Sequence, residues 1–429
     1  MHMPGSGVNG AIVPPAPSNG TAQLAWQRLA PERWPLPPAA FPPGTALVGG
    51  AVRDALLNRL GPQPDLDFVL PGDAVALCRQ LQRHHGGSAV VLDAGRSIAR
   101  LVLKGWSVDL ARQEGGSLSA DLQRRDYTIN AMALPLAEPW TLVDPHGGSA
   151  HLAAGELVAV SEANLLDDPL RLLRGPRLAS ALGFRIETRS LAWIAQHHAR
   201  LVEVAGERVL AELEKLAAAP EGQNWLIQVL HCGLLGPWRA GVVDETLLER
   251  LSARQAAALG LTAAETAEAL PLARLAALLD GEGLRALHSS RRLQQRVERL
   301  RQWQQRLGTS APATCAEALP ELERLKLQRQ LEQDLPALLL SWPAGSAGTW
   351  LQRWRDPEDP LFHPRPAIDG GSLQRELQLQ ASPQLGALLE RLMLERAFGR
   401  LHERAEALAL ARSWLACNDN DGAKAPRRD

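Results

Sequence analysis

The stretch TALVGGAVRDALLNRLGPQPDLDFVL, residues 45–70, decides the fold that this sequence predicts. Its first four residues are a short apolar run that favours a β-strand, and its last six are predicted to form a second strand. The stretch 49–60 between them has helical spacing. Gly49 and Gly50 stand where the first strand meets the helix. Two glycines let a phosphate approach the backbone closely, and the helix N-terminus behind them offers unpaired N–H groups. A simple tight turn is the alternative interpretation.

Two acidic residues, Asp65 and Asp67, lie two positions apart on the second of these strands. Side chains at i and i+2 of a strand point to the same face, so the carboxylates repel each other unless a cation binds them. Mg²⁺ prefers oxygen ligands and suits phosphate substrates, so we expect it here. Arg53 and Asp54 lie in the preceding helix, where Arg53 faces the same site. Two solvated aspartates on an exposed strand edge are the alternative.

The segments that follow extend this unit into a sheet. The sequence predicts a helix over 73–85 and strands over 88–92, 98–103 and 106–110. A central sheet with such helices is an α/β or α+β head. Asp109 stands in an apolar setting on the last strand, where it can complete a carboxylate triad with the aspartate pair. A solvent-facing aspartate is the alternative.

The segment RRDYTINA, residues 124–131, carries a third group of polar residues. Arg124 and Arg125 suit triphosphate oxygens, because guanidinium groups bind phosphate in a forked geometry. Asp126 and Asn130 can hydrogen-bond ribose hydroxyls. A solvated charge run followed by a helix-capping asparagine is the alternative.

The segment DDPLRLLRGPR, residues 167–177, is predicted to be a helix on which Asp168, Arg171 and Arg174 recur every three positions. Such residues share one face. An aspartate accepts a hydrogen bond from an amino group and an arginine donates two, so together they can read the edge of a base. A surface helix with internal ion pairs is the alternative.

Beyond residue 160 the sequence is rich in Leu, Ala, Arg and Glu at helical spacing, so 161–429 is predicted to be all-α. Within it, Arg291, Arg292, Arg296 and Arg299 form a basic run that can follow RNA phosphates. A solvated face with ion-pair partners on neighbouring helices is the alternative.

Bulk composition excludes several classes of protein. The hydrophobic content of 45% and charged content of 22% are ordinary for a globular protein, and the net charge of −1 neither requires nor excludes a nucleic-acid partner. The four cysteines form no CxxC pair, which predicts reduced thiols without a zinc site. No signal peptide or membrane-spanning run is evident. We therefore expect a cytoplasmic protein that does not associate with a membrane. We infer no obligate protein partner.

Together these motifs resemble, in order and spacing, the class II tRNA nucleotidyltransferase and bacterial poly(A) polymerase family of the polymerase-β-like superfamily. The resemblance implies an α+β fold: an N-terminal nucleotidyltransferase head with a small mixed sheet, followed by an all-α neck, body and tail. The matching stretches are GGAVRD (49–54), DLD (65–67), RRDYTINAMA (124–133), DDPLRLLRGPRLA (167–179), ERVLAELEKL (207–216) and PAIDGGSL with SPQLGALLERL (366–392).

The resemblance implies a reaction and its site residues. Two Mg²⁺ ions at Asp65 and Asp67 would activate an RNA 3′-hydroxyl and steady the departing pyrophosphate. The RNA would be the acceptor end of tRNA, and the nucleotide would be CTP and possibly ATP. The family's nucleotide contacts fall on Gly49, Gly50, Arg53 and Asp54 for the triphosphate, on Arg124, Arg125, Asp126 and Asn130 for triphosphate and ribose, and on Asp168, Arg171 and Arg174 for the base.

The resemblance also divides the chain. We expect a disordered tail (1–22), the nucleotidyltransferase head (23–150), a neck with the base-selecting helix (151–218), a helical body (219–315) and a helical tail that binds RNA (316–429).

The sequence departs from the family pattern in three places, and the last of them is informative. The selecting motif usually begins Glu-Asp, but Asp167 precedes Asp168 here, and the family's Asp and Arg after the RRD block are replaced by His151 and Val158. The segment 110–123 is short, whereas members that build the whole CCA end carry a longer flexible loop there. We therefore predict a CC-adding enzyme. A CCA-adding or A-adding enzyme, a poly(A) polymerase acting on general RNA, and a non-enzymatic RNA-binding protein stay as alternatives.

Overall fold

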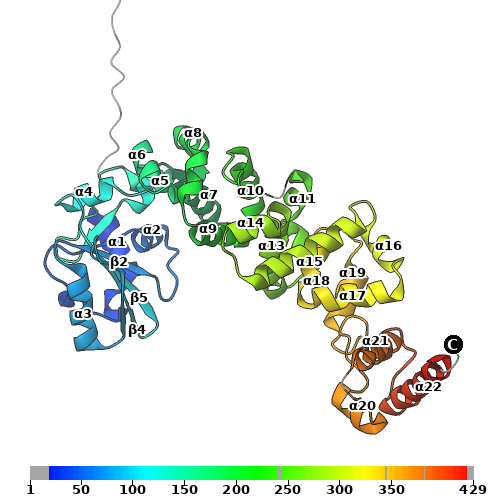
Figure 1. Ribbon diagram of the computed structural model, residues 1–429. Helices are drawn as coiled ribbons and strands as arrows, with labels where there is room; N and C mark the ends of the chain where they lie inside the picture. The colour runs from blue at the N-terminus through cyan, green and yellow to red at the C-terminus, as the bar shows by residue number, and fades with distance from the viewer. Residues whose placement is uncertain (1–18, 240, 242, 344, 381, 423–429) are drawn as a thin grey trace, which may run out of the picture. The chain divides into compact units, whose positions relative to one another are not determined.

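The computed structural model describes residues 19–422, apart from positions 240, 242, 344 and 381 (Figure 1). The chain forms two compact units. One contains the residues up to Val204 together with His231–Leu234, and the other contains Ala205–Leu230 and Leu235 onward. Each unit is described by itself below.

The first unit is built on a mixed six-stranded sheet of strand order β3-β4-β5-β2-β1-β6. Strands β2 and β5 are parallel, and the other neighbours are antiparallel. The parallel pair is possible because α3 and the β3–β4 hairpin connect the two strands. The strands are β1 (Ala46–Val48), β2 (Leu66–Leu70), β3 (Ser88–Asp93), β4 (Ile98–Leu103), β5 (Trp106–Arg112) and β6 (Ala133–Pro135).

One face of the sheet is covered by α3 (Ala74–His85), as Figure 1 shows, and aromatic side chains also pack on it. The Asp73 side chain caps α3 by accepting hydrogen bonds from two backbone N–H groups of its first turn. Gly86, whose φ is +81°, follows the last residue of the helix. Phe68 on β2 packs against Trp34 and Phe41, with ring centroids 5.6 and 4.5 Å apart.

The opposite face is only partly covered. Leu122 of α4 (Leu118–Gln123) packs on Val48, Val69 and Ala133 over one half of the sheet. Asp67 lies on this face, because side chains alternate along a strand and Val69 is two positions away. The face that carries the expected metal ligand is therefore closed at its β1, β2 and β6 side.

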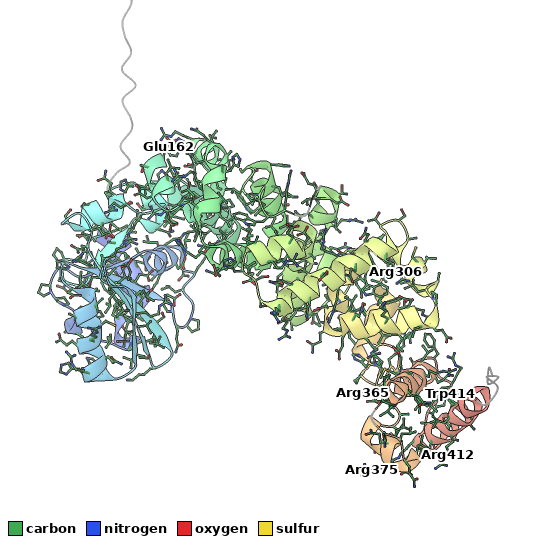
Figure 2. All side chains as sticks on the ribbon, in the orientation of Figure 1. Glu162, Arg306, Arg365, Arg375, Arg412 and Trp414 are labelled. Atoms are coloured by element: carbon green, nitrogen blue, oxygen red, sulfur yellow. The ribbon has the colours of Figure 1, made fainter. Side chains whose placement is uncertain are left out.

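The remaining helices of the first unit surround the sheet and extend beyond it. They are α1 (Asn19–Leu29), α2 (Gly50–Leu57), α5 (Gly148–Ala154), α6 (Glu162–Asp167), α7 (Leu170–Leu182) and α8 (Thr188–Gln196), with 3₁₀ turns η1 (Pro31–Arg33), η2 (Pro38–Ala40), η3 (Thr128–Asn130) and η4 (His198–Glu203). Glu162, labelled in Figure 2, links α6 to α8 through His197, whose Nε2 lies 2.6 Å from its Oε1.

Two expectations about secondary structure were wrong in detail. The predicted disordered tail 1–22 overlaps α1, which begins at Asn19, whereas residues 1–18 lie outside the described residues. The helical region predicted from 161 onward contains β8 (Arg185–Ile186), which pairs in parallel with β7 (Glu156–Leu157). A two-residue strand carries no period-2 signal, so its pairing depends on the packing around it.

The rest of the chain is helical. Its helices are α9 (Gly206–Ala218), α10 (Gly222–His231), α11 (Glu245–Arg250), α12 (Ala253–Ala258), α13 (Ala263–Leu278), α14 (Gly281–Ala286), α15 (Arg291–Leu307), α16 (Pro312–Glu317), α17 (Glu321–Leu331), η5 (Glu332–Asp334), α18 (Leu335–Leu339), α19 (Gly348–Arg355), α20 (Gly370–Leu377), α21 (Pro383–Ala397) and α22 (Arg404–Gly422). Among the described residues, no helix is long and apolar enough to cross a membrane.

A fully buried arginine, Arg274 on α13, ties several of these helices together. Burial lowers its pKa to about 10, because a charged group loses its hydration there. Its guanidinium donates hydrogen bonds to Gln223 and to backbone carbonyls, those of Ala217, Ala219, Pro220 and Leu251. The helix C-terminal carbonyls of α9 thereby find the donors that they would otherwise lack.

The last helices, α20 to α22, share an apolar cluster of their own. Leu373, Leu388, Leu392 and Ala407 lie at its centre. Trp414, labelled in Figure 2, packs against this cluster and lies under the Arg391 guanidinium, 4.5 Å from its ring centroid. The segment 366–392, which resembled the family's tail, thus contributes to this cluster.

Candidate active site

The aspartates of the second strand lie at the centre of the candidate site. Asp67 is half-buried on β2, and Asp65 is exposed immediately before the strand begins. Burial is the first cause that raises the pKa of Asp67 from 3.8 to about 6. The negative charges of Asp109 and Asp65 raise it further, while Arg125 acts against them. A carboxylate whose charged form is disfavoured in this way is stabilised by a nearby cation, which agrees with the expected metal site.

Asp109 lies beside Asp67, because the two are register partners on the parallel strands β5 and β2. Its carboxylate is already bound: Arg100 on β4 donates from Nε and Nη2 to the two oxygens, at 2.7 and 2.8 Å. In the part of the chain that the structure describes, no three His, Cys, Asp or Glu side chains are grouped to hold a metal ion. Asp109 thus lies next to Asp67 with its own oxygens bound by Arg100, and its part in the expected carboxylate triad stays a prediction.

Gly49 brings three of the sequence motifs together. Its φ is +72°, a conformation that side-chain-bearing residues rarely adopt. A Cβ added there would lie 3.2 Å from Oδ2 of Asp67 and 3.6 Å from Nη1 of Arg125. At Gly50 a Cβ would lie 3.5 Å from Nη2 of Arg53. Backbone, carboxylate and guanidinium groups thus converge at the start of α2.

Arg53 connects the glycine turn to the RRDYTINA segment. Its Nε and Nη2 bind both carboxylate oxygens of Asp54, and its Nη1 donates to the Asn130 side-chain oxygen at 2.7 Å. Asn130 is buried, and its amide nitrogen lies 3.3 Å from Asp126 Oδ1. The asparagine side chain is therefore engaged at both ends by protein partners rather than pointing into open space.

Asp126 is buried and connects the RRDYTINA segment to the predicted base-selecting helix. It accepts hydrogen bonds from the Tyr127 backbone N–H at 2.8 Å and from Arg174 Nε at 3.0 Å. Burial disfavours its charged form, but Arg174 and these hydrogen bonds outweigh burial and hold its pKa below the usual range. Asp126 and Asn130 thus support Arg174 and Arg53, and they contact other protein groups where a direct ribose contact was expected.

Tyr127, which sequence analysis did not single out, joins the same segment to α7. Its hydroxyl donates to the Arg171 carbonyl at 2.8 Å, and its ring is fully buried. A Cβ added to Gly175 would lie 2.3 Å from that hydroxyl, so only glycine fits at this close crossing. The base-selecting helix is therefore held in register with the RRDYTINA segment.

The predicted base-reading residues lie at the start of α7. Arg171 donates from Nη1 to the carbonyls of Arg124 and Asn164, at 2.9 and 2.8 Å. Asp168 accepts from the Leu170 N–H at 3.3 Å. One corner of the Arg171 guanidinium is therefore fixed by backbone, which sets the direction in which the rest of the group points.

The short segment before the two arginines is also fixed by ion pairs. Glu114 pairs with Arg124 at 2.5 Å and with Arg96 of the β3–β4 turn at 2.7 Å. Arg125 pairs with the buried Asp121 at 3.1 Å. These partners were missed because nothing in the local sequence marks a carboxylate as the mate of an arginine elsewhere in the fold. The only available signal was their proximity to the RRDYTINA motif.

Of the four arginines predicted to contact RNA on α15, one forms an ion pair within the protein. Arg296 is half-buried and donates hydrogen bonds to the Asp334 carboxylate, the nearest at 2.7 Å, as the alternative of an ion pair with a neighbouring helix expected. Arg291, Arg292 and Arg299 are exposed, and contact with RNA stays a prediction for them. Arg306, labelled in Figure 2, lies on the same helix and pairs with Glu323.

The chain is similar to known nucleotidyltransferases. Residues 45–158 match a family described as "Poly A polymerase head domain", and residues 183–238 match one described as "Probable RNA and SrmB- binding site of polymerase A". A CC-adding tRNA nucleotidyltransferase of Synechocystis is 34% identical over 400 residues, 87% of this chain and 94% of the relative. An A-adding tRNA nucleotidyltransferase of Deinococcus radiodurans is 40% identical over 208 residues, 47% of this chain and 46% of the relative.

Among solved structures, a CCA-adding enzyme in complex with CTP is similar with a TM-score of 0.69. It is 22% identical and the match covers 92% of this chain and 98% of that one. At this identity the likeness shows the fold, an α+β head followed by helices, which the sequence motifs had predicted.

Proposed function

The chain belongs to the tRNA nucleotidyltransferase family, and on that premise we propose that it adds the two cytidines of the CCA end to tRNA. The observation that carries the proposal is the convergence of Gly49, Asp67 and Arg125. A backbone turn that accepts a phosphate, a strained carboxylate and a guanidinium within one site suit phosphoryl transfer, in which positioning and charge stabilisation supply most of the catalysis.

Within this proposal the side chains take distinct roles. Gly49 and Gly50 admit the triphosphate, and Arg53, Arg124 and Arg125 bind its oxygens. Asp54 orients Arg53 by holding two of its nitrogens. Asp126 and Asn130 act through Arg174 and Arg53, because their own polar atoms are engaged within the protein.

Enzymes of this family use a divalent metal, and the residues present fit Mg²⁺. Asp65 and Asp67 are hard oxygen donors, and Asp67 carries a raised pKa that a cation would relieve. Mg²⁺ commonly binds one or two carboxylates together with substrate phosphates, so a third protein ligand is not required. When bound, the metal supplies positive charge at the triphosphate and at the attacking hydroxyl. Asp65 and Asp67 would hold it beside the glycine turn.

Base selection is assigned to Asp168 and Arg171, which can pair with a base edge without a nucleic-acid template. The anchoring of Arg171 to the Arg124 carbonyl supports a single base preference. Arg124 is in turn held by Glu114 of the short 110–123 segment, and Glu114 by Arg96. A selector fixed through this series of contacts favours one nucleotide, which we propose is CTP.

The experiment that tests this proposal measures incorporation of labelled CTP and labelled ATP separately. The acceptors are tRNAs that end at the discriminator base, after one added C and after two. We expect CTP to be used on the first two acceptors and ATP to be used poorly on the third. Efficient addition of the terminal A would refute the CC specialisation, and ATP chains on unrelated RNA would instead indicate a poly(A) polymerase.

A further inference from the structure

Half of the sheet face that carries Asp67 is open, and no function has been assigned to it. On this half, formed by β3, β4 and the start of β5, Val90 is 47% exposed and Val102 is 44% exposed. The Arg100 side chain is 45% exposed. Two exposed valines and a half-exposed arginine therefore share this face, beside the half that α4 covers.

The strand register places these residues in rows with the catalytic aspartates. Val90 pairs with Arg100, Arg100 with Asp109, and Asp109 with Asp67. Neighbouring strands lie about 4.8 Å apart, so the row runs about 14 Å from Asp67 to Val90. Val102 pairs with Ser107 in the adjacent row. The valines and Arg100 therefore form one surface that continues directly from the carboxylates.

The proposed function determines from which side the RNA must arrive. The glycine turn and Arg53 lie on the β1 side of Asp67, since Val48 of β1 is the register partner of Asp67. The triphosphate is expected there. In phosphoryl transfer the attacking and leaving oxygens are roughly in line on opposite sides of phosphorus, so the 3′-hydroxyl must approach from the other side. That side is the row of Asp109, Arg100 and Val90.

The chemistry of this surface fits the end of an RNA strand. Apolar side chains accept the face of a base or a ribose, and an arginine binds the phosphodiester between nucleosides. Two nitrogens of Arg100 bind Asp109, and the third, Nη1, makes no hydrogen bond with any residue that the structure describes. We propose that Val90, Val102 and Arg100 seat the 3′-terminal nucleotides of the RNA acceptor. This inference rests on the proposed function and extends it to the second substrate.

The test uses two valines of the same strand that differ in the face they occupy. Val90→Asp places a negative charge on the proposed RNA seat. Val91→Asp is the matched control, because Val91 is 40% exposed but pairs with Ala99, whose buried side chain faces α3. Both substitutions are at exposed positions, and thermal unfolding is measured to compare their stability. Steady-state incorporation of CMP is then measured with the full chain and tRNA that ends at the discriminator base.

We expect Val90→Asp to raise KM for tRNA by about tenfold, with KM for CTP unchanged, because an apolar contact is lost and a charge opposes the phosphates. Val91→Asp should leave both constants within about twofold of the wild type. Equal effects of the two variants, or none, would overturn the inference. If the wild type incorporates no CMP, the proposed function itself fails, which is a distinguishable result.

A second measurement covers the other possible occupant, a second copy of the chain paired along the edge strand β3. Sedimentation of the wild type and of Val90→Asp is compared without RNA. If both proteins are monomers, the result supports the proposal that this surface binds RNA. A dimer that Val90→Asp dissociates would show that this face joins two copies, and the inference would then be wrong.

Discussion

Replacing Asp67 by asparagine should abolish activity and at the same time stabilise the protein. The pKa of Asp67 is raised from 3.8 to about 6, so its charge opposes folding. In the folded state it holds its proton to a higher pH than in the unfolded chain. This cost is absent well below pH 3.8, grows as pH rises from 3.8 to about 6, and is fully present above that range. Asparagine carries no charge and avoids the cost.

The size of the effect follows from the shift. A raise of about two units corresponds to about 3 kcal/mol at neutral pH as an upper limit. Asp67 is half-buried, so solvent screens part of this, and we expect about 1–2 kcal/mol. For a unit of this size that is about 3–6 °C in the midpoint of thermal unfolding. The midpoint is measured in EDTA at pH 7.5 and pH 4, and the gain should be largest at pH 7.5.

Asp65→Asn is the matched control for this experiment. Asp65 is exposed, so its removal should abolish CMP incorporation but change the unfolding midpoint by much less than Asp67→Asn does. Added Mg²⁺ should stabilise the wild type and neither variant, because ligands stabilise only the state that binds them. If Asp67→Asn were no more stable than the wild type in EDTA at pH 7.5, the reasoning about its strained charge would be refuted.

Three further outcomes are expected. Gly49→Ala should lower kcat for CMP incorporation by at least about tenfold, because a positive φ and a Cβ 3.2 Å from Asp67 disturb the site, and an unchanged kcat would contradict this. The rate of CMP incorporation should fall as pH drops through about 6, where Asp67 takes up a proton. Lowering the Mg²⁺ concentration should move this fall to higher pH, because metal and proton compete for the carboxylate. A pH profile that does not change with Mg²⁺ would argue against this role of Asp67. Arg296→Ala should destabilise the protein by about 2 kcal/mol through loss of the Asp334 pair, whereas Arg299→Ala should leave stability unchanged and raise KM for tRNA; the reverse pattern in thermal unfolding and kinetics would disprove the assignment.

The strand, turn and helix at 45–70 could be predicted because their signals are local. A glycine pair between an apolar run and a helical pattern, followed by alternating aspartates, leaves few backbone conformations. The mixed sheet followed by helices, which the family resemblance implied, is confirmed. The strand order was not predicted, and it places Asp109 beside Asp67. The ends of segments do not follow from such local signals, as the start of α1 at Asn19 illustrates.

The sequence alone determined which residue types are candidates for the chemistry, because carboxylates bind hard metal ions and arginines and free backbone N–H groups bind phosphate. It did not determine their partners. Arg100 binds Asp109, Asp126 binds Arg174, and these pairs join strands or segments far apart in the chain. Such pairings depend on strand register and on how helices pack, which are collective properties of the fold. Tertiary structure therefore decided which polar groups support the site and which face of the sheet stays open.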